Sequence, residues 1–242
     1  MAKSPGMSET VYKGDTIRNW IVRYSFFFLG LMVLGLGIAM SIKVKHLGLH
    51  PWDVVNVALF QRFGLSIGTW SILVSIVLII AARMIKGKHV NIGTFLNALV
   101  MGPILDFYLW LDFLPDPTNS AIDYLFLLVG IVTMGIGGGL NVAGGIGAGP
   151  RDGFMLTVSE RTGFSVRNAR IVTESVVLLI GFLLGGPAFV VSFLYTFIQS
   201  PVFQLSLKFF SGVRRELAPP ASKVFEVCKD RAGAESVGTC TQ

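Results

Sequence analysis

Two short motifs contain the residues best suited to hold a solute. In each, a glycine turn leads into proline, then tryptophan or arginine, then aspartate. Proline favours the first position of a helix, which puts each aspartate in the first helical turn. A helix N-terminus has free N–H groups and a partial positive charge, and it can hold an anionic or polar group. The candidate substrate-binding residues from these motifs are Pro51, Trp52, Asp53, Gly147, Gly149, Pro150, Arg151 and Asp152.

A purely structural role stays open for each aspartate, because a carboxylate in the first turn stabilises a helix start whether or not a ligand binds. Arg151 stands where the first motif has Trp52. This cation either pairs with Asp152 or receives a substrate anion. The glycines of the run Gly145-x-Gly147-x-Gly149 allow close approach of backbone to a ligand or to another helix.

Two polar residues within apolar segments complete the set of candidates. Glu174 follows Arg170 by four residues, so an i, i+4 ion pair and a proton or cation role are equally open. Asn97 is suited to bridging helices by hydrogen bonds, and direct contact with a ligand is its second interpretation. Asp106 interrupts another apolar segment near its end, where we expect it to be solvated.

The motifs belong to an internal duplication. Aligning Pro51 with Pro150, an offset of 99 residues, brings the two aspartates into register. The similarity extends over a whole half of the chain, so a functional site should involve both copies. At the same offset Arg62 matches Arg161, Gly64 matches Gly163 and Ser66 matches Ser165. After gaps of one residue, Gly35 matches Gly135, Gly37 matches Gly137, Thr94 matches Ser192 and Pro103 matches Pro201.

The composition indicates an integral membrane protein. Hydrophobic residues make up 52% of the chain and charged residues 14%, and the mean hydropathy is +0.68. A soluble protein of this composition would have a surface nearly bare of charge. Helices of about 20 apolar residues cross the roughly 30 Å of hydrocarbon in a bilayer. We predict six such spans, at 20–42, 68–85, 92–111, 122–142, 168–184 and 188–208.

The expected fold is all-α, with two three-helix repeats at 20–111 and 122–210. Three is an odd number, so the second repeat enters the membrane in the opposite direction to the first. The segments 51–62 and 150–161 would form helices of roughly 18 Å, too short to cross, and we expect them to be re-entrant or interfacial. The remaining segments are an N-terminal tail at 1–19, an outside loop at 112–121 and a polar tail at 211–242.

Lysine and arginine gather in the two tails and in the connections after the second and fourth spans. Positive residues are retained on the cytoplasmic side, so both termini are expected to be cytoplasmic. The first outside connection, with Lys43, Lys45 and Arg62, is an exception. This topology explains most of the net charge of +6. Nucleic-acid binding is not expected, because the chain lacks a basic face with aromatic platforms.

Enzyme signatures are thin in the sequence. It has no His-Glu-x-x-His and no phosphate-binding Gly-x-x-x-x-Gly-Lys. Cys228 and Cys240 match no common zinc or redox spacing. We therefore expect a protein that is not an enzyme, with no catalytic residues, no cofactor and no metal site. Transport would draw on an ion gradient, on a separate energising subunit or on the gradient of the solute.

Several motifs resemble the YczE/YyaS/YitT group of bacterial membrane proteins, and the YczE branch most closely. These motifs are Gly-Leu-x-Pro-Trp-Asp (48–53), Gly-Thr-x-x-Asn-Ala-x-x-x-Gly-Pro (93–103), Gly-Ala-Gly-Pro-Arg-Asp-Gly (147–153) and Leu-Leu-Gly-Gly-Pro (183–187). The resemblance covers roughly residues 24–208 and implies a multi-pass protein of the bacterial inner membrane. The soluble C-terminal domain of YitT-type members is missing here, so regulation by such a domain is not expected.

Inverted repeats related by a pseudo-two-fold axis are a recurrent design of secondary transporters. We therefore expect a transporter or permease of a small polar or charged solute, with its site near the middle of the bilayer between the repeats. Two alternatives stay open: a non-catalytic scaffold or assembly factor, and the substrate-capturing subunit of a larger transporter. The expected partners are the lipid bilayer and the solute, and a homodimer or an energising subunit is compatible with the sequence.

Overall fold

The computed structural model describes residues 8–85, 91–111, 114–115, 117–118, 120–147, 149–187 and 190–217. Every regular element in these residues is an α-helix, as the sequence predicts. The helices are α1 (Ser8–Lys43), α2 (Pro51–Phe63), α3 (Ile67–Met84), α4 (Ile92–Trp110), α5 (Ala121–Ala143), α6 (Pro150–Thr162), α7 (Val166–Leu183) and α8 (Val190–Leu217).

Four helices are long and apolar enough to cross a membrane. They are α1 over residues 17–43, α3, α4 and α5. They coincide with the first four predicted spans. The predicted fifth and sixth spans coincide with α7 and α8, which are more polar. The predicted tail segments lie partly in helices, because α1 already begins at Ser8 and α8 continues to Leu217. Residues 218–242, with both cysteines, lie outside the described residues.

Helix α7 has described charged residues on its inner side and exposed apolar residues on its outer side. Arg170 and Glu174 are partly buried inside the protein. Val176, Leu179 and Leu183 are exposed on the outside of the helix. A lipid-facing apolar side with an inward polar side is what a membrane helix that lines a polar site requires.

The two short helices have matching ends. Pro51 opens α2 and Pro150 opens α6, each at the first helical position. Each helix stops at a glycine with positive φ, Gly64 at 73° and Gly163 at 72°, a conformation that other residues rarely adopt. The prediction of short helices at 51–62 and 150–161 is therefore confirmed, each with one further residue.

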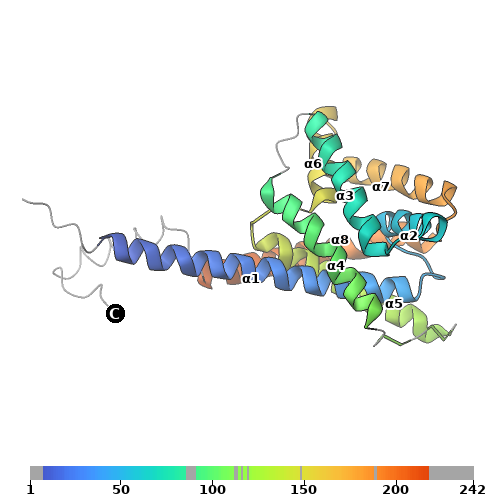
Figure 1. The fold of residues 1–242 in the computed structure, drawn as a ribbon, viewed down its shortest axis with the longest axis horizontal. Coiled ribbons are helices and arrows are strands. Elements are labelled where there is room, and N and C mark those ends of the chain that lie inside the picture. The colour runs from blue at the N-terminus through green and yellow to red at the C-terminus, as the bar shows by residue number, and fades with distance from the viewer. Residues whose placement is uncertain are drawn as a thin grey trace, which may run out of the picture.

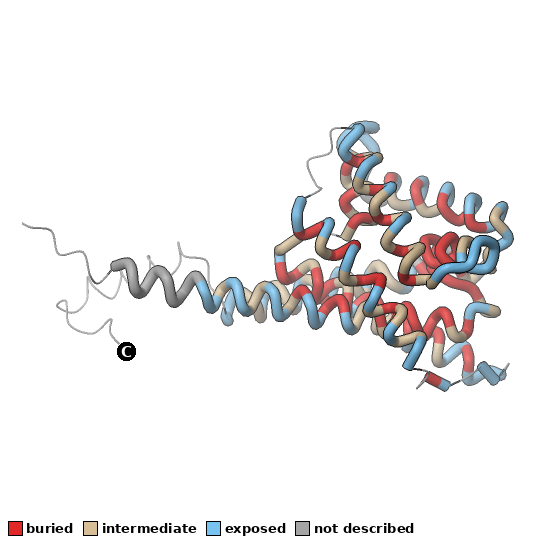
Figure 2. Tube along the Cα trace, viewed as in Figure 1, coloured by how far each residue is buried: buried red, intermediate tan, exposed pale blue. Residues whose placement is uncertain are grey.

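Helix α1 runs along the longest axis of the molecule, with α3, α6 and α7 to one side of it (Figure 1). It packs against α5, which in turn packs against α8. Across the middle of the molecule, α2 packs against α7 and α3 packs against α6. Buried residues concentrate on the inner sides of the helices (Figure 2), whereas the described residues from Ile17 to Ser25 of α1 are mostly exposed.

Glycines allow the backbones of α1 and α5 to touch. A Cβ at Gly37 would lie 2.6 Å from the amide nitrogen of Met134, and one at Gly137 would lie 2.7 Å from Leu34 Cα. A Cβ at Gly139 would meet Ser206 Oγ of α8 at 2.6 Å. The hydrophobic effect between helices is weak in lipid, so their association depends on close van der Waals contact. Small residues at the crossings allow that contact.

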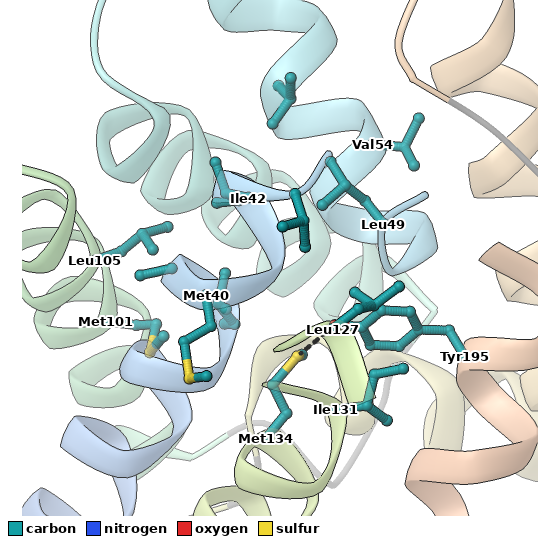
Figure 3. Close-up of a cluster of buried hydrophobic side chains, with 14 of the residues drawn as sticks. Met40, Ile42, Leu49, Val54, Met101, Leu105, Leu127, Ile131, Met134 and Tyr195 are labelled. Carbon is teal, nitrogen blue, oxygen red and sulfur yellow. Dashed lines mark hydrogen bonds between the residues drawn. The ribbon is translucent and has the colours of Figure 1, made fainter. Parts of the chain in front are cut away.

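A buried apolar cluster lies where α1, α4, α5 and α8 meet the start of α2. It includes Met40, Leu49, Met101, Ile131 and Met134. Figure 3 shows Tyr195 of α8 pointing into this cluster, with its hydroxyl donating a hydrogen bond to Met134 Sδ at 3.2 Å. The cluster packs α1, α4, α5 and α8 against one another and against α2.

Asp106 caps a neighbouring helix, which corrects the expectation that it is merely solvated. Its carboxylate accepts hydrogen bonds from Ser66 Oγ and, at 2.8 Å, from the backbone N–H of Gly68. Ser66 itself caps α3 by accepting from Thr69 N–H at 3.0 Å. The carboxylate of α4 thus satisfies donors at the first turn of α3 that water would otherwise have to satisfy.

We expect Asp106→Ala to lower the free energy of unfolding by about 1–2 kcal/mol, since a cap and one buried donor lose their partner. Thermal unfolding of the detergent-solubilised protein measures the loss. A melting temperature equal to that of the wild type would show that the cap contributes nothing.

Candidate functional site

The first turns of the two short helices are joined by an ion pair. Arg151 Nη2 of α6 donates to Asp53 Oδ1 of α2 at 2.9 Å. The Asp53 side chain is 2% exposed and that of Arg151 is 24% exposed. The Arg151 guanidinium also lies 5.8 Å from the centre of the Trp52 ring, within cation–π range. The structure therefore pairs Arg151 with the aspartate of the other motif and not, as one expectation had it, with Asp152.

Asp152 pairs with a cation of α7 instead. Arg170 Nη2 donates to Asp152 Oδ1 at 3.2 Å, and Arg170 Nη1 donates to Ser200 Oγ of α8 at 3.1 Å. Glu174 Oε1 lies 3.9 Å from Arg170 Nε, which confirms the i, i+4 ion pair as one of its two interpretations. Asp152, Arg170 and Glu174 form a triad in which one guanidinium lies between two carboxylates.

His50 links the start of α2 to the triad. It precedes Pro51 as the N-cap residue of α2, and its Nε2 lies 3.9 Å from Glu174 Oε1. Its ring packs edge-on against Tyr195 with centroids 5.6 Å apart. Among the described residues, the buried side-chain atoms without a hydrogen-bond partner are His50 Nδ1, Asp53 Oδ2 and both polar atoms of Asn56. All of them come from α2 and its N-cap, the face of the site that is most deeply buried.

Two cavities meet at the triad. The inner cavity, of about 130 Å³, is lined by residues of α1 to α8, among them His50, Trp52 and Asn97. The outer cavity, of about 730 Å³, lies between α6, α7 and α8 and includes Phe197 and Gln204. Asp152, Arg170, Glu174 and Ser200 line both cavities.

The inner cavity is lined at equivalent positions of the two halves. The offset of 99 residues relates four polar or aromatic lining residues of the first half to lining residues of the second half, so the cavity lies where the halves face each other. Those pairs are His50 with Gly149, Trp52 with Arg151, Ser71 with Arg170 and Ser75 with Glu174.

The two halves also contact each other through the equivalent loops that precede α2 and α6. A Cβ at Gly48 would lie 3.3 Å from Ser192 at the start of α8, and one at Gly147 would lie 2.7 Å from the amide nitrogen of Thr94 at the start of α4. Gly48 and Gly147 are equivalent, as are Thr94 and Ser192. Each loop before a short helix therefore docks on the last long helix of the other half.

Two hydrogen bonds between helices also lie at equivalent positions of the two halves. Asn97 Nδ2 of α4 donates to Asn141 Oδ1 of α5 at 3.0 Å. In the matching place, the hydroxyls of Tyr195 in α8 and Ser41 in α1 share a hydrogen bond. Asn141 Nδ2 further donates to the carbonyl oxygen of Phe27 at 3.0 Å. The helix-bridging interpretation of Asn97 is confirmed, and Asn97 lines the inner cavity as well.

The structure brings most of the predicted site residues together. Asp53 does not line either cavity and is the buried partner of Arg151. Gly147 is not among the lining residues of either cavity, and its contacts are with the first turn of α4. The predicted residues that line a cavity are Pro51, Trp52, Asn97, Gly149, Pro150, Arg151, Asp152 and Glu174.

Several site residues were missed in the sequence. His50 directly precedes the first proline, but no sequence pattern predicts that it lies beside Glu174. Ser71 and Ser75 look unremarkable in an apolar helix, yet the 99-residue offset aligns them with Arg170 and Glu174. The repeat could therefore have pointed to both serines. Ser200 has no comparable signal, because its role depends on where α8 lies.

A profile of a family of unknown function, DUF6198, matches residues 21–213. The uncharacterized membrane protein YczE of Bacillus subtilis is 34% identical over 167 residues, which cover 69% of this chain and 77% of that protein. An uncharacterized protein of Haemophilus influenzae is 32% identical over 69% of this chain and 76% of its own length. The uncharacterized protein YyaS of Bacillus subtilis is 24% identical over 69% of this chain and 83% of its own length. No solved structure matches the chain.

Proposed function

We propose that this chain, which belongs to the family of unknown function DUF6198 and is an integral membrane protein, transports a small polar or charged solute across the bacterial inner membrane. One observation carries the proposal: a cavity lined by charged and polar side chains from both halves lies inside a bundle of apolar helices. Ionisable groups are costly at membrane depth, and their usual reason is a solute or ion pathway.

The proposed architecture is a pair of inverted three-span repeats with six crossings. Reciprocal contacts support it: α2 packs on α7 as α3 packs on α6, and the loops at Gly48 and Gly147 dock on equivalent helices. The apolar outer face of α7 supports its role as the fifth span. With the positive residues on the inside, both termini lie in the cytoplasm.

The two motifs differ in a way that suits alternating access. Asp53 is 2% exposed and sealed by Arg151, whereas the equivalent Asp152 is 37% exposed and faces the outer cavity. The outer cavity is lined by α7 between residues 170 and 178 and by α8 between residues 192 and 207. In the proposed topology the segment with Asp152 enters from the cytoplasmic side, so this cavity opens to the cytoplasm. The structure then corresponds to an inward-open state, and an outward-open state would seal Asp152 and expose Asp53.

A ligand screen by thermal shift tests the proposal, since a solute that binds the folded state raises the apparent melting temperature. We expect a metabolite or ion to stabilise the wild type and to lose its effect in Asp152→Asn, while that variant stays folded. The exposed Asp152 is a better probe than Asp53, whose burial gives it a structural role under any function. A folded protein that no solute stabilises would favour the scaffold alternative.

A further inference from the structure

We propose that the beginning of α1 and the ends of α5 and α8 form a binding site for the headgroup of an anionic phospholipid. The groups that bind it are the guanidiniums of Arg23 in α1 and Arg214 in α8. Neither residue lines either of the two cavities. Lipid binding at this site is therefore independent of the proposed transport, and it can be tested separately.

Both guanidiniums converge on the C-terminal end of α5. Arg23 Nε donates to the carbonyl oxygen of Gly144 at 3.2 Å, and Arg23 Nη2 donates to that of Gly145. Arg214 Nη1 donates to the same Gly144 oxygen at 3.4 Å. A Cβ at Gly145 would lie 2.5 Å from Arg214 Nη1 and 3.9 Å from Arg23 Nη2. Two positive charges from different helices are thus held side by side at one turn.

The protein compensates only part of this positive charge. A helix C-terminus carries a partial negative charge of about half an elementary charge, which favours one nearby arginine but does not balance two. No ion pair between described residues includes Arg23 or Arg214. Like charges that share one carbonyl oxygen repel each other, so an anion that contacts both guanidiniums would be attracted to this place.

A phosphate group fits the chemistry of the pair. Arg23 directs two N–H groups at carbonyl oxygens and Arg214 directs one, which leaves further donors on each guanidinium. Both residues are partly exposed, so a headgroup can reach them. Arginine matches the oxygens of phosphate with two parallel hydrogen bonds. In the proposed topology this end of the bundle faces the cytoplasmic leaflet, where basic pockets between helices bind phosphate headgroups.

An aromatic surface beside Arg23 suits the rest of a lipid. The Arg23 guanidinium lies 5.1 Å from the centre of the Trp20 ring. Trp20 stacks on Tyr24 with centroids 5.6 Å apart, and Tyr24 stacks on Phe28 with centroids 6.4 Å apart. These three exposed rings line a shallow groove of about 550 Å³ on α1. Trp and Tyr favour the depth of the headgroups, so the groove leads from the guanidiniums along the apolar part of α1, where an acyl chain would lie.

The test adds dioleoyl phosphatidylglycerol to the purified, delipidated protein in a neutral detergent. Dioleoyl phosphatidylcholine, with the same chains but no net charge, and inorganic phosphate are the comparisons. Native mass spectrometry measures the retained lipid, and thermal shift measures stabilisation. We expect phosphatidylglycerol alone to be retained by the wild type and to stabilise it. Arg214→Gln should weaken the apparent affinity for phosphatidylglycerol about fivefold, because one positive charge at the headgroup is lost.

Two further variants keep the test interpretable. Arg83→Gln removes one positive charge from the exposed end of α3, which packs against α2, α4 and α6, and should retain phosphatidylglycerol as the wild type does. Arg23→Gln should weaken retention as Arg214→Gln does, and it replaces that variant if Arg214→Gln does not fold.

Three results would overturn the lipid site. Equal retention of phosphatidylglycerol by the Arg83→Gln protein and the folded Arg23→Gln or Arg214→Gln protein would leave the two guanidiniums as caps of α5 alone, even if the latter variants were less stable. Equal retention of phosphatidylcholine would show that the groove takes any lipid. Equal stabilisation by inorganic phosphate would show a site for a free anion. The proposed transport function would stand after each of these results.

Discussion

Replacing Gly137 with leucine should unfold the membrane domain or leave it aggregated. A Cβ at this position would fall within 2.8 Å of Val33 C and closer still to the Leu34 backbone, where no side-chain rotation can relieve the clash. The crossing of α1 and α5 would have to open along its length. Overpacking of this kind costs about 3 kcal/mol or more. Size-exclusion profiles and thermal unfolding in detergent measure the effect.

Gly212→Ala is the matched control. Gly212 lies in α8 with no atom within 4 Å of its added Cβ. Alanine there should leave the protein as stable as the wild type or more stable by up to about 1 kcal/mol, because it favours the helix. A Gly137→Leu protein with the wild-type melting temperature would show that close contact between α1 and α5 is not required.

Replacing Asp53 with asparagine should destabilise the protein by about 2–4 kcal/mol, since it removes one partner of a buried ion pair and leaves Arg151 uncompensated. The amide can still accept from Arg151, but its NH₂ group would meet the place where Asp53 Oδ2 already lacks a partner. Thermal unfolding or a denaturant titration in detergent measures the loss.

A double variant separates the ion pair from other effects. Asp53→Asn together with Arg151→Gln removes both charges and should recover a large part of the lost stability. Asp152→Asn, at the equivalent position of the second motif and 37% exposed, should cost less than about 1 kcal/mol. Equal losses for Asp53→Asn and Asp152→Asn would contradict the asymmetry of the two motifs.

The elements followed from the sequence because local signals specify them. Pro51 and Pro150 begin the short helices, glycines at 64 and 163 end them, and the long apolar runs predicted the helices that coincide with spans. These are properties of residues close together in the chain.

The pairing of charges could not be predicted from the sequence, because it depends on how the two halves pack together. Asp152 lies one residue from Arg151 in the sequence, yet Arg151 reaches Asp53 in the other half, 98 residues away. The burial of His50 and the cap made by Asp106 are likewise contacts between elements. The repeat offset is a sequence signal that links the two halves, since it aligns Ser71 and Ser75 with Arg170 and Glu174, and all four residues line the inner cavity.

Access to the cavity from both sides of the membrane tests the central claim most directly, and it requires no knowledge of the solute. Ser200 lines both cavities and can be replaced with cysteine in a Cys228→Ser, Cys240→Ser background. Membrane-impermeant thiol reagents are then applied to right-side-out and inside-out vesicles, with Glu160→Cys as the control that reacts only from the cytoplasmic side. A transporter with alternating access predicts that the cysteine at position 200 reacts from both sides. Reaction from the cytoplasmic side alone would contradict the proposed function.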